Sequence, residues 1–274
     1  MRADELERIL VPARDAARQA ADLALGGFRK RPLVEHKGAV DLVTSFDRDS
    51  ETLLRKLLTT ALPYDIVGEE QGGAWNEAVP TFFIDPIDGT TNFVHGHPFW
   101  CVSIGLVIDG QPTLGVVRAP VLGLEWFGYV AEDGARRAVR RSATEEESCV
   151  VSGLTRFEES LLATGFPYDR SMSSENNFDA FVAIKQRCQA VRRCGSAALD
   201  LCLVADGTYE GYWERKLRPW DIAGGIALVR AAGGHVSELD GGMGCITSGH
   251  VVATNGLIHG RLLAELDAVA ASRR

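Results

Sequence analysis

The chain has 274 residues, 46% of them hydrophobic, and carries a formal net charge of −8 at pH 7. This length supports one large domain or two closely packed lobes around a substantial core. The acidic balance argues against general electrostatic binding to DNA, RNA or anionic lipid.

Helical spacing of the apolar residues predicts helices over residues 4–28 and 47–61, which end at Gly26-Gly27 and before Pro63. Strands are predicted at residues 65–68, 81–84, 100–108, 112–118 and 123–130. Asp109-Gly110 lies between two of these strands and is typical of a tight hairpin turn.

A polar stretch at Arg140–Ser148 is the best candidate for a boundary between lobes. We therefore expect an N-terminal α+β lobe over residues 1–141 and a C-terminal α/β lobe over residues 142–274, packed as one compact unit. In the second lobe the pattern predicts helices near 155–163, 174–190, 196–205 and 221–232, and a strand near 208–213. The arginine pairs at 136–137 and 140–141 are expected to be ordinary solvated charges.

The cysteines and the first residues bear on the compartment. None of the six cysteines forms a C-x-x-C pair and no histidine cluster accompanies them, which argues against a zinc site and favours reduced, buried thiols. The opening MRADELERIL does not have the pattern of a secretory signal, and the longest apolar run, near residues 99–108, is too short to span a bilayer. These features predict a cytoplasmic protein.

The stretch IDPIDGTTNF at residues 84–93 follows a predicted buried strand. Asp85 and Asp88 supply carboxylates, which hard divalent cations prefer as ligands. The fixed backbone of Pro86 can turn the Ile87 carbonyl toward them, and Gly89 permits a conformation that other residues resist. On its own, such a motif is more often a polar turn after a strand.

Other acids occupy similar places at the ends of predicted elements. Glu69 and Glu70 follow the strand at 65–68, Asp41 and Asp47 flank a predicted helix start, and Asp221 opens the apolar helix at 221–232. Asp221 alone is most simply a helix N-cap. Four acidic clusters at the ends of predicted elements, in a sequence without a zinc motif, together favour a Mg²⁺ site.

The sequence resembles the inositol monophosphatase family. DPIDGTTNF is similar to the D-P-[IL]-D-G-[ST] signature, and WDIAGGIALVRAAGG is similar to the second signature of that family. KGAVDLVTSFD, VGEEQG, LATGFPYD and RRCGSAALDLCLVADG occur in the family's order, so the resemblance covers roughly residues 5–265. Two departures, Gly224-Gly225 and Phe99-Trp100, are expected to affect the wall of the site or a dimer surface.

The resemblance implies layered α-β-α-β-α packing with two sheets, commonly in a homodimer, and two to three Mg²⁺ ions. Glu69, Asp85, the Ile87 carbonyl and Thr90 match the family's first metal set. Asp85, Asp88 and Asp221 match the second, and Glu69 would face a third ion through water.

The same resemblance implies roles around the reacting water. Glu69 and Thr90 would orient the water, while Asp47 would accept a hydrogen bond from Thr90. The backbone N–H groups of Gly89 and Thr90, beside Asp88, would hold the phosphate oxygens. Lys37 and Asp41 are expected to shape a strand pair over the site.

On the substrate side, Gly195, Ser196 and Ala197 precede a predicted helix whose N–H groups are expected to face the ligand. The resemblance implies that Glu214 binds ring hydroxyls. It also implies a lithium-sensitive, Mg²⁺-dependent phosphatase for myo-inositol 1-phosphate. Fructose 1,6-bisphosphate, NADP and histidinol phosphate remain alternative substrates of the same chemistry. A second alternative is an additional role in binding the transcription machinery, since some bacterial relatives have one; no direct contact with nucleic acid or membrane is expected.

Overall fold

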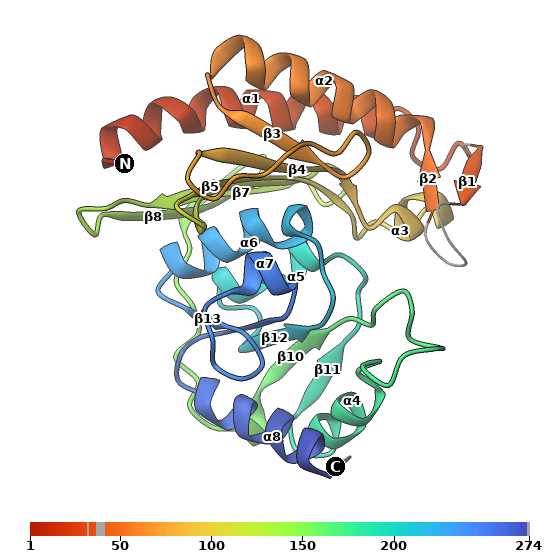
Figure 1. The fold of residues 1–274 in the computed structure, drawn as a ribbon, viewed down its shortest axis with the longest axis vertical. Coiled ribbons are helices and arrows are strands. Elements are labelled where there is room, and N and C mark those ends of the chain that lie inside the picture. The colour runs from red at the N-terminus through yellow and green to blue at the C-terminus, as the bar shows by residue number, and fades with distance from the viewer. Residues whose placement is uncertain (32, 37–41, 273–274) are drawn as a thin grey trace.

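A computed structural model describes residues 1–31, 33–36 and 42–272 of the chain. Its layers alternate helix, sheet, helix, sheet and helix from top to bottom of Figure 1, which confirms the expected layered fold. The helices are α1 (Ala3–Leu25), α2 (Ser45–Ala61), α3 (Thr90–His95), α4 (Phe178–Lys185), α5 (Ala197–Ala205), α6 (Pro219–Ala231), α7 (Cys245–Ser248) and α8 (His259–Ala271).

The upper sheet has seven strands in the order β3-β4-β5-β6-β7-β8-β9. They are β3 (Asp65–Gly68), β4 (Thr81–Asp88), β5 (Cys101–Ile108), β6 (Gln111–Ala119), β7 (Leu124–Val130), β8 (Arg136–Arg141) and β9 (Glu146–Ser148). Only the β3–β4 pair is parallel. The turn between β5 and β6 contains Asp109 at φ 50° and Gly110 at φ 70°, as the hairpin prediction requires.

The lower sheet has five strands in the order β11-β10-β12-β14-β13. They are β10 (Leu161–Thr164), β11 (Ala190–Arg192), β12 (Gly211–Glu214), β13 (His235–Ser237) and β14 (Val251–Thr254). A separate pair, β1 (Val34–His36) and β2 (Leu42–Thr44), lies near α3 in Figure 1. Lys37 and Asp41, expected to shape this strand pair, lie outside the described residues.

The middle layer consists of α5 and α6, which pack against each other between the sheets (Figure 1). Most of α6 is buried, because one side contacts β5 and β6 and another contacts α5. Gly224 brings the helix so near the sheet that a Cβ there would lie 2.8 Å from the Ile104 carbonyl oxygen. A Cβ on Gly225 would lie 2.5 Å from the Cβ of Leu201. The Gly224-Gly225 departure therefore serves helix packing, where we expected it to alter the cavity wall or a dimer surface.

One predicted helix is wrong. Residues 155–163 form a short 3-10 turn (Phe157–Glu159) followed by β10, which lies between two parallel neighbours in the lower sheet. Pairing on both sides overrides the weak helical pattern here, because a strand with two neighbours satisfies its backbone polar groups along both edges. The helix predicted at 174–190 is shorter and covers Phe178–Lys185.

The predicted division at residue 141 stays a prediction. β9 extends the upper sheet to Ser148, and α6 from the second half packs beneath that sheet.

All six cysteines are free thiols, four of them buried. Within the described residues, no helix combines the length and apolar character needed to cross a membrane.

Candidate active site

A cavity of about 550 Å³ opens where the upper sheet meets the amino ends of α3, α5 and α6. It gathers residues that lie far apart in the sequence, and almost all of the sequence-predicted site residues line it. These are Glu69, Asp85, Ile87, Asp88, Gly89, Thr90, Gly195, Ser196, Ala197, Glu214 and Asp221. The sequence-predicted residue Asp47 is not part of the lining but contacts Thr90 from behind, through a hydrogen bond of 3.1 Å.

β4 positions the first carboxylates. All its residues are buried, and it runs parallel to β3, so Glu69 emerges beside the end of β4 and its N–H donates to the Ile84 carbonyl (3.3 Å). The pairing of β4 with β5 is interrupted between Asp85 and Asp88, where Pro86 and Ile87 lie. The Ile87 N–H donates to Oδ1 of Asp85 at 2.9 Å and fixes that side chain.

Asp88 joins the upper sheet to α5. Its Oδ2 atom accepts a hydrogen bond of 2.6 Å from the Ser196 hydroxyl and one of 2.7 Å from the Ala198 N–H. The next residue, Gly89, has φ 98°, in the left-handed region that favours glycine. A Cβ at this position would lie 3.1 Å from the Phe99 carbonyl oxygen and 3.2 Å from that of Gly195. Gly89 therefore permits both the turn and the close approach of the loop before α5.

Thr90 is held by a buried chain of hydrogen bonds. Its hydroxyl lies 3.1 Å from Oδ1 of Asp47 and 3.1 Å from the Ile87 carbonyl oxygen. Oδ2 of Asp47 accepts from both the N–H (2.8 Å) and the hydroxyl (2.6 Å) of Thr44, which caps α2. Because the single hydroxyl proton of Thr90 is directed at these two acceptors, the oxygen of this hydroxyl keeps its lone pairs for a partner in the cavity.

Asp221 lies in the first turn of α6. Its Oδ2 atom accepts at 2.7 Å from the N–H of Arg218, which is the N-cap residue of α6. Asp221 is thus the third residue of the helix and completes a capping box, where we expected it to be the N-cap itself. The residue also lines the cavity, and burial, together with repulsion from Asp88 and Glu69, raises its pKa well above the usual value. The capping and ligand interpretations are therefore compatible.

Burial and mutual repulsion dominate the electrostatics of this acidic wall. Burial, with repulsion from Glu69, Asp88 and Asp221, raises the pKa of Asp85 well above its usual value. Burial also raises the pKa of Asp88 to about 6, against the lowering effect of its hydrogen bonds from Ser196 and Ala198. Such clustered carboxylates are costly in the ionised form unless cations join them.

The donor set fits a hard divalent cation. The carboxylates and the Ile87 carbonyl are oxygen ligands, the type that Mg²⁺ prefers. Within the described ranges, no three His, Cys, Asp or Glu side chains converge closely enough to form a ready ion cage.

The opposite wall holds Glu214, at the end of β12. It is only 8% exposed, its Oε2 accepts from the Tyr212 hydroxyl, and burial raises its pKa to about 7. Gly165 makes room for it, because a Cβ there would lie 2.0 Å from Oε2 of Glu214.

The cavity lining also includes charged residues to which the sequence analysis gave no role, among them Arg193, Asp200 and Lys216. Asp200 is 2% exposed, and its Oδ1 has no hydrogen-bond partner among the described residues. Burial and repulsion from Glu214 raise its pKa well above the usual value, whereas nearby Arg193 lowers it. An acid within the otherwise apolar helix AALDLCLVA is the signal that identifies Asp200.

Comparison with known proteins agrees with these features. A sequence model of the inositol monophosphatase family matches residues 5–271. The chain is 42% identical over 235 residues to an inositol-1-monophosphatase from Synechocystis, covering 84% of this chain and 78% of that protein. It is 36% identical to the Nus factor SuhB of Pasteurella multocida, over 87% of this chain and 88% of that protein. The structure of an inositol monophosphatase from Anabaena superposes with a TM-score of 0.85 at 36% identity, covering 96% and 97% of the two chains.

Proposed function

The chain belongs to the inositol monophosphatase family and is a phosphatase, and from that premise we propose that it hydrolyses myo-inositol 1-phosphate with Mg²⁺. The observation that carries this proposal is the single cavity that Glu69, Asp85, Asp88 and Asp221 share with Glu214. One wall offers anionic oxygen ligands for cations, and the other offers a carboxylate for hydroxyl groups.

We assign the ions to two sets of ligands and a weaker third position. Glu69, Asp85, the Ile87 carbonyl and Thr90 would hold one ion, and Asp85, Asp88 and Asp221 would hold another. Glu69 would contact the third ion through water. When bound, such ions neutralise the phosphate dianion, lower the pKa of the attacking water and stabilise the leaving oxygen.

The protein groups orient the reactants. The hydroxyl proton of Thr90 is directed at Asp47 and Ile87, so its oxygen would accept a hydrogen bond from the attacking water. Glu69 would accept the proton that this water loses. The N–H groups of Gly89 and Thr90 would contact the phosphate oxygens.

The opposite wall would recognise the sugar-like ring. Glu214 is buried and already accepts from Tyr212, so its carboxylate is held in place for a ring hydroxyl. The loop at Gly195, Ser196 and Ala197 lines the same side, and the unpartnered oxygen of Asp200 offers a second acceptor for hydroxyl groups. Buried polar groups that lose a substrate hydroxyl are left unpaired, which favours a polyol over a simple alkyl phosphate.

A substrate panel tests this assignment. Phosphate release is measured at one Mg²⁺ concentration for myo-inositol 1-phosphate, fructose 1,6-bisphosphate, NADP and histidinol phosphate. The proposal expects the highest kcat/KM for inositol phosphate. A higher kcat/KM for any of the other three compounds would identify that compound as the preferred substrate, with the same metal-assisted hydrolysis.

Several finer properties belong to the same proposal: a homodimer, a cytoplasmic location, and inhibition by Li⁺ through replacement of a Mg²⁺. The similarity to a protein named Nus factor SuhB favours a second candidate function, a role in binding transcription proteins. A pull-down from the source cytosol with an inactive Asp88→Asn variant separates the two functions, because a binding role survives the loss of catalysis.

A further inference from the structure

A second groove lies away from the acidic cavity and shares no lining residue with it. It encloses about 490 Å³ between α1, the β6–β7 turn and the end of β8. Its lining includes four arginines (Arg14, Arg18, Arg118 and Arg141) but only two acids (Asp15 and Glu125). With four arginines against two acids, the lining carries a local excess of positive charge in a chain whose net charge is −8.

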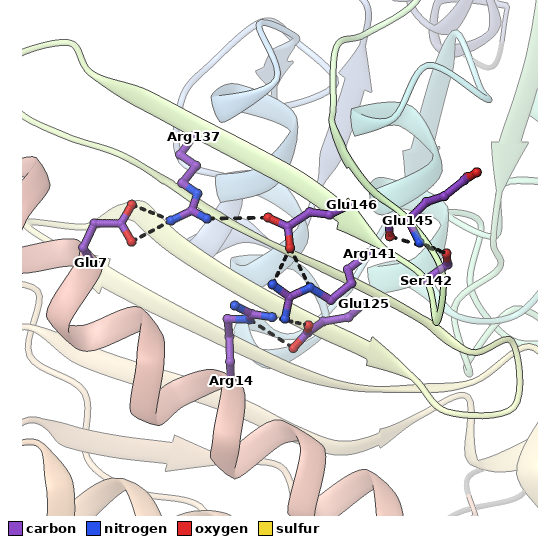
Figure 2. A network of polar contacts seen from close by, with 8 residues as sticks. All are labelled: Glu7, Arg14, Glu125, Arg137, Arg141, Ser142, Glu145 and Glu146. Carbon is purple, nitrogen blue, oxygen red and sulfur yellow. Dashed lines mark hydrogen bonds and ion pairs between the residues drawn. The ribbon is translucent and has the colours of Figure 1, made fainter.

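The arginines gather around one glutamate because of strand register. Arg118 on β6 and Arg141 on β8 both pair with Glu125 of the intervening strand β7, so the three side chains form a row on one face of the sheet. Arg14 reaches this row from α1, as Figure 2 shows, and donates two hydrogen bonds to Glu125 (3.3 and 2.7 Å). The single carboxylate of the row is thereby paired with Arg14.

The other arginines of the groove have counterions. Arg18 contacts Asp15 at 2.7 Å, and Arg141 contacts Glu146 (Figure 2). These two arginine side chains are 55% and 42% exposed, and exposed ion pairs of this kind are weak and exchange easily.

Arg118 differs from all of them. It forms no ion pair or hydrogen bond with any residue in the described parts of the chain, and its Nε is shielded from solvent. Its natural cross-strand partner, Glu125, is held by Arg14. The guanidinium charge of Arg118 is therefore not compensated by an acidic partner among the described residues, and an anion in the groove would supply the counterion.

We propose that this groove binds a small phosphate-bearing anion, with Arg118 as its anchor. A guanidinium presents parallel N–H donors that match two oxygens of a phosphate group. Arg18 and Arg141 can turn from their exposed partners toward the same anion, and the hydroxyl of Ser142 lines the groove beside them. The anion is either free inorganic phosphate or the phosphate group of a metabolite.

Calorimetric titration at low ionic strength tests the proposal, with inorganic phosphate and glucose 6-phosphate as separate probes. EDTA is present, so that the metal-free acidic cavity repels anions and contributes little binding. Arg118→Ala is compared with Arg136→Ala, a matched loss of an exposed arginine on β8 that does not line the groove.

We expect Arg118→Ala to weaken phosphate binding at least tenfold and Arg136→Ala to leave it unchanged. Tighter binding of glucose 6-phosphate than of phosphate would identify an ester as the ligand, and the reverse order would identify the free ion. If Arg118→Ala lowers the melting temperature, Arg118→Lys replaces it, because that variant keeps the charge and loses the paired donors. Equal affinities of the wild type and the Arg118 variant, or no binding by the wild type, would overturn the proposal.

A second readout separates the groove from catalysis. Arg118 lies outside the catalytic cavity, so Arg118→Ala is expected to release phosphate from substrate at the wild-type rate when little phosphate is present. A large loss of activity in a folded Arg118→Ala variant would contradict a separate site.

Discussion

Ser196 donates a hydrogen bond of 2.6 Å to Oδ2 of Asp88, across 108 residues of sequence. The contact connects the last residue of β4 to the residue that caps α5. It couples the wall that would hold the cations to the wall that would hold the substrate. Because the Ala198 N–H donates to the same oxygen at 2.7 Å, Asp88 is held from two directions.

Replacing Ser196 by alanine should therefore impair the site without abolishing it. A hydrogen bond to a charged group contributes about 1.5–3 kcal/mol, and Ala198 still holds the carboxylate. We expect kcat/KM to fall by about tenfold and the Mg²⁺ requirement to rise. Ser152→Ala, outside the cavity, is the control and should leave both unchanged. A Ser196→Ala variant with wild-type kinetics would show that the contact does not position Asp88.

Glu214→Gln tests recognition of the ring. The substitution keeps the shape but removes the charge from a buried acceptor, so KM for inositol 1-phosphate should rise about 10- to 100-fold. Hydrolysis of p-nitrophenyl phosphate, which has no ring hydroxyls, should change by less than about threefold. Equal losses on both substrates, measured as kcat/KM, would instead place Glu214 in the chemistry common to both.

The stability of the metal-free protein should depend on the ionisation of Asp88. Burial raises the pKa of Asp88 to about 6 from its ordinary value of 3.8, so the folded state binds more protons than the unfolded state between these values. Stability from this group therefore falls as pH rises from about 4 to 6, by roughly 2–3 kcal/mol.

His259 opposes this trend, because burial lowers its pKa to about 4 and the folded state then binds fewer protons between pH 4 and 6.5. Comparison with Asp88→Asn removes the His259 effect, which both proteins share. In urea unfolding with EDTA present, the free energy of unfolding of Asp88→Asn should increase relative to that of the wild type as pH rises from 4 to 7. If the difference in free energy of unfolding between the two proteins does not vary with pH, the pKa of Asp88 is not raised in the folded protein.

The packing of α6 predicts a cost for adding a single methyl group. A Cβ on Gly224 would press on the Ile104 carbonyl oxygen at 2.8 Å, so Gly224→Ala should lower the free energy of unfolding by about 1–3 kcal/mol. Gly260, in α8, has no atom within 4 Å of its Cβ position, so Gly260→Ala should be neutral or stabilising by up to about 1 kcal/mol. Denaturant unfolding of the two variants tests this prediction, and similar free energies of unfolding for Gly224→Ala and Gly260→Ala would contradict the close packing at Gly224.

Sequence reasoning found the parts of the fold whose signals are local. β4 is a short apolar run that ends in DPIDG, and α6 is an apolar segment opened by Pro-Trp-Asp, so both were visible in the pattern. β10 was not found, because its strand character comes from parallel partners that are distant in sequence. The hydrogen bond expected from Thr90 to Asp47 is present, since both residues belong to motifs that the sequence displays.

Other features depend on packing that no local pattern encodes. Asp200 faces the cavity only because α5 lies between the two sheets, and its sequence context resembles a core helix. Arg141 was expected to be a solvated charge, yet strand register places it in a row with Glu125 and Arg118. Register across three strands cannot be deduced from composition, so the second groove was not foreseen.

Phosphate release from myo-inositol 1-phosphate, measured while Mg²⁺ is raised from zero, tests the central claim most directly. The wild type should be inactive in EDTA and reach a maximum rate as Mg²⁺ saturates the acidic wall. Folded Asp88→Asn should remain at least about a thousandfold slower at every Mg²⁺ concentration, because it loses a ligand carboxylate. Turnover by the wild type without a divalent cation, or near wild-type turnover by Asp88→Asn, would contradict metal-assisted hydrolysis at this cavity.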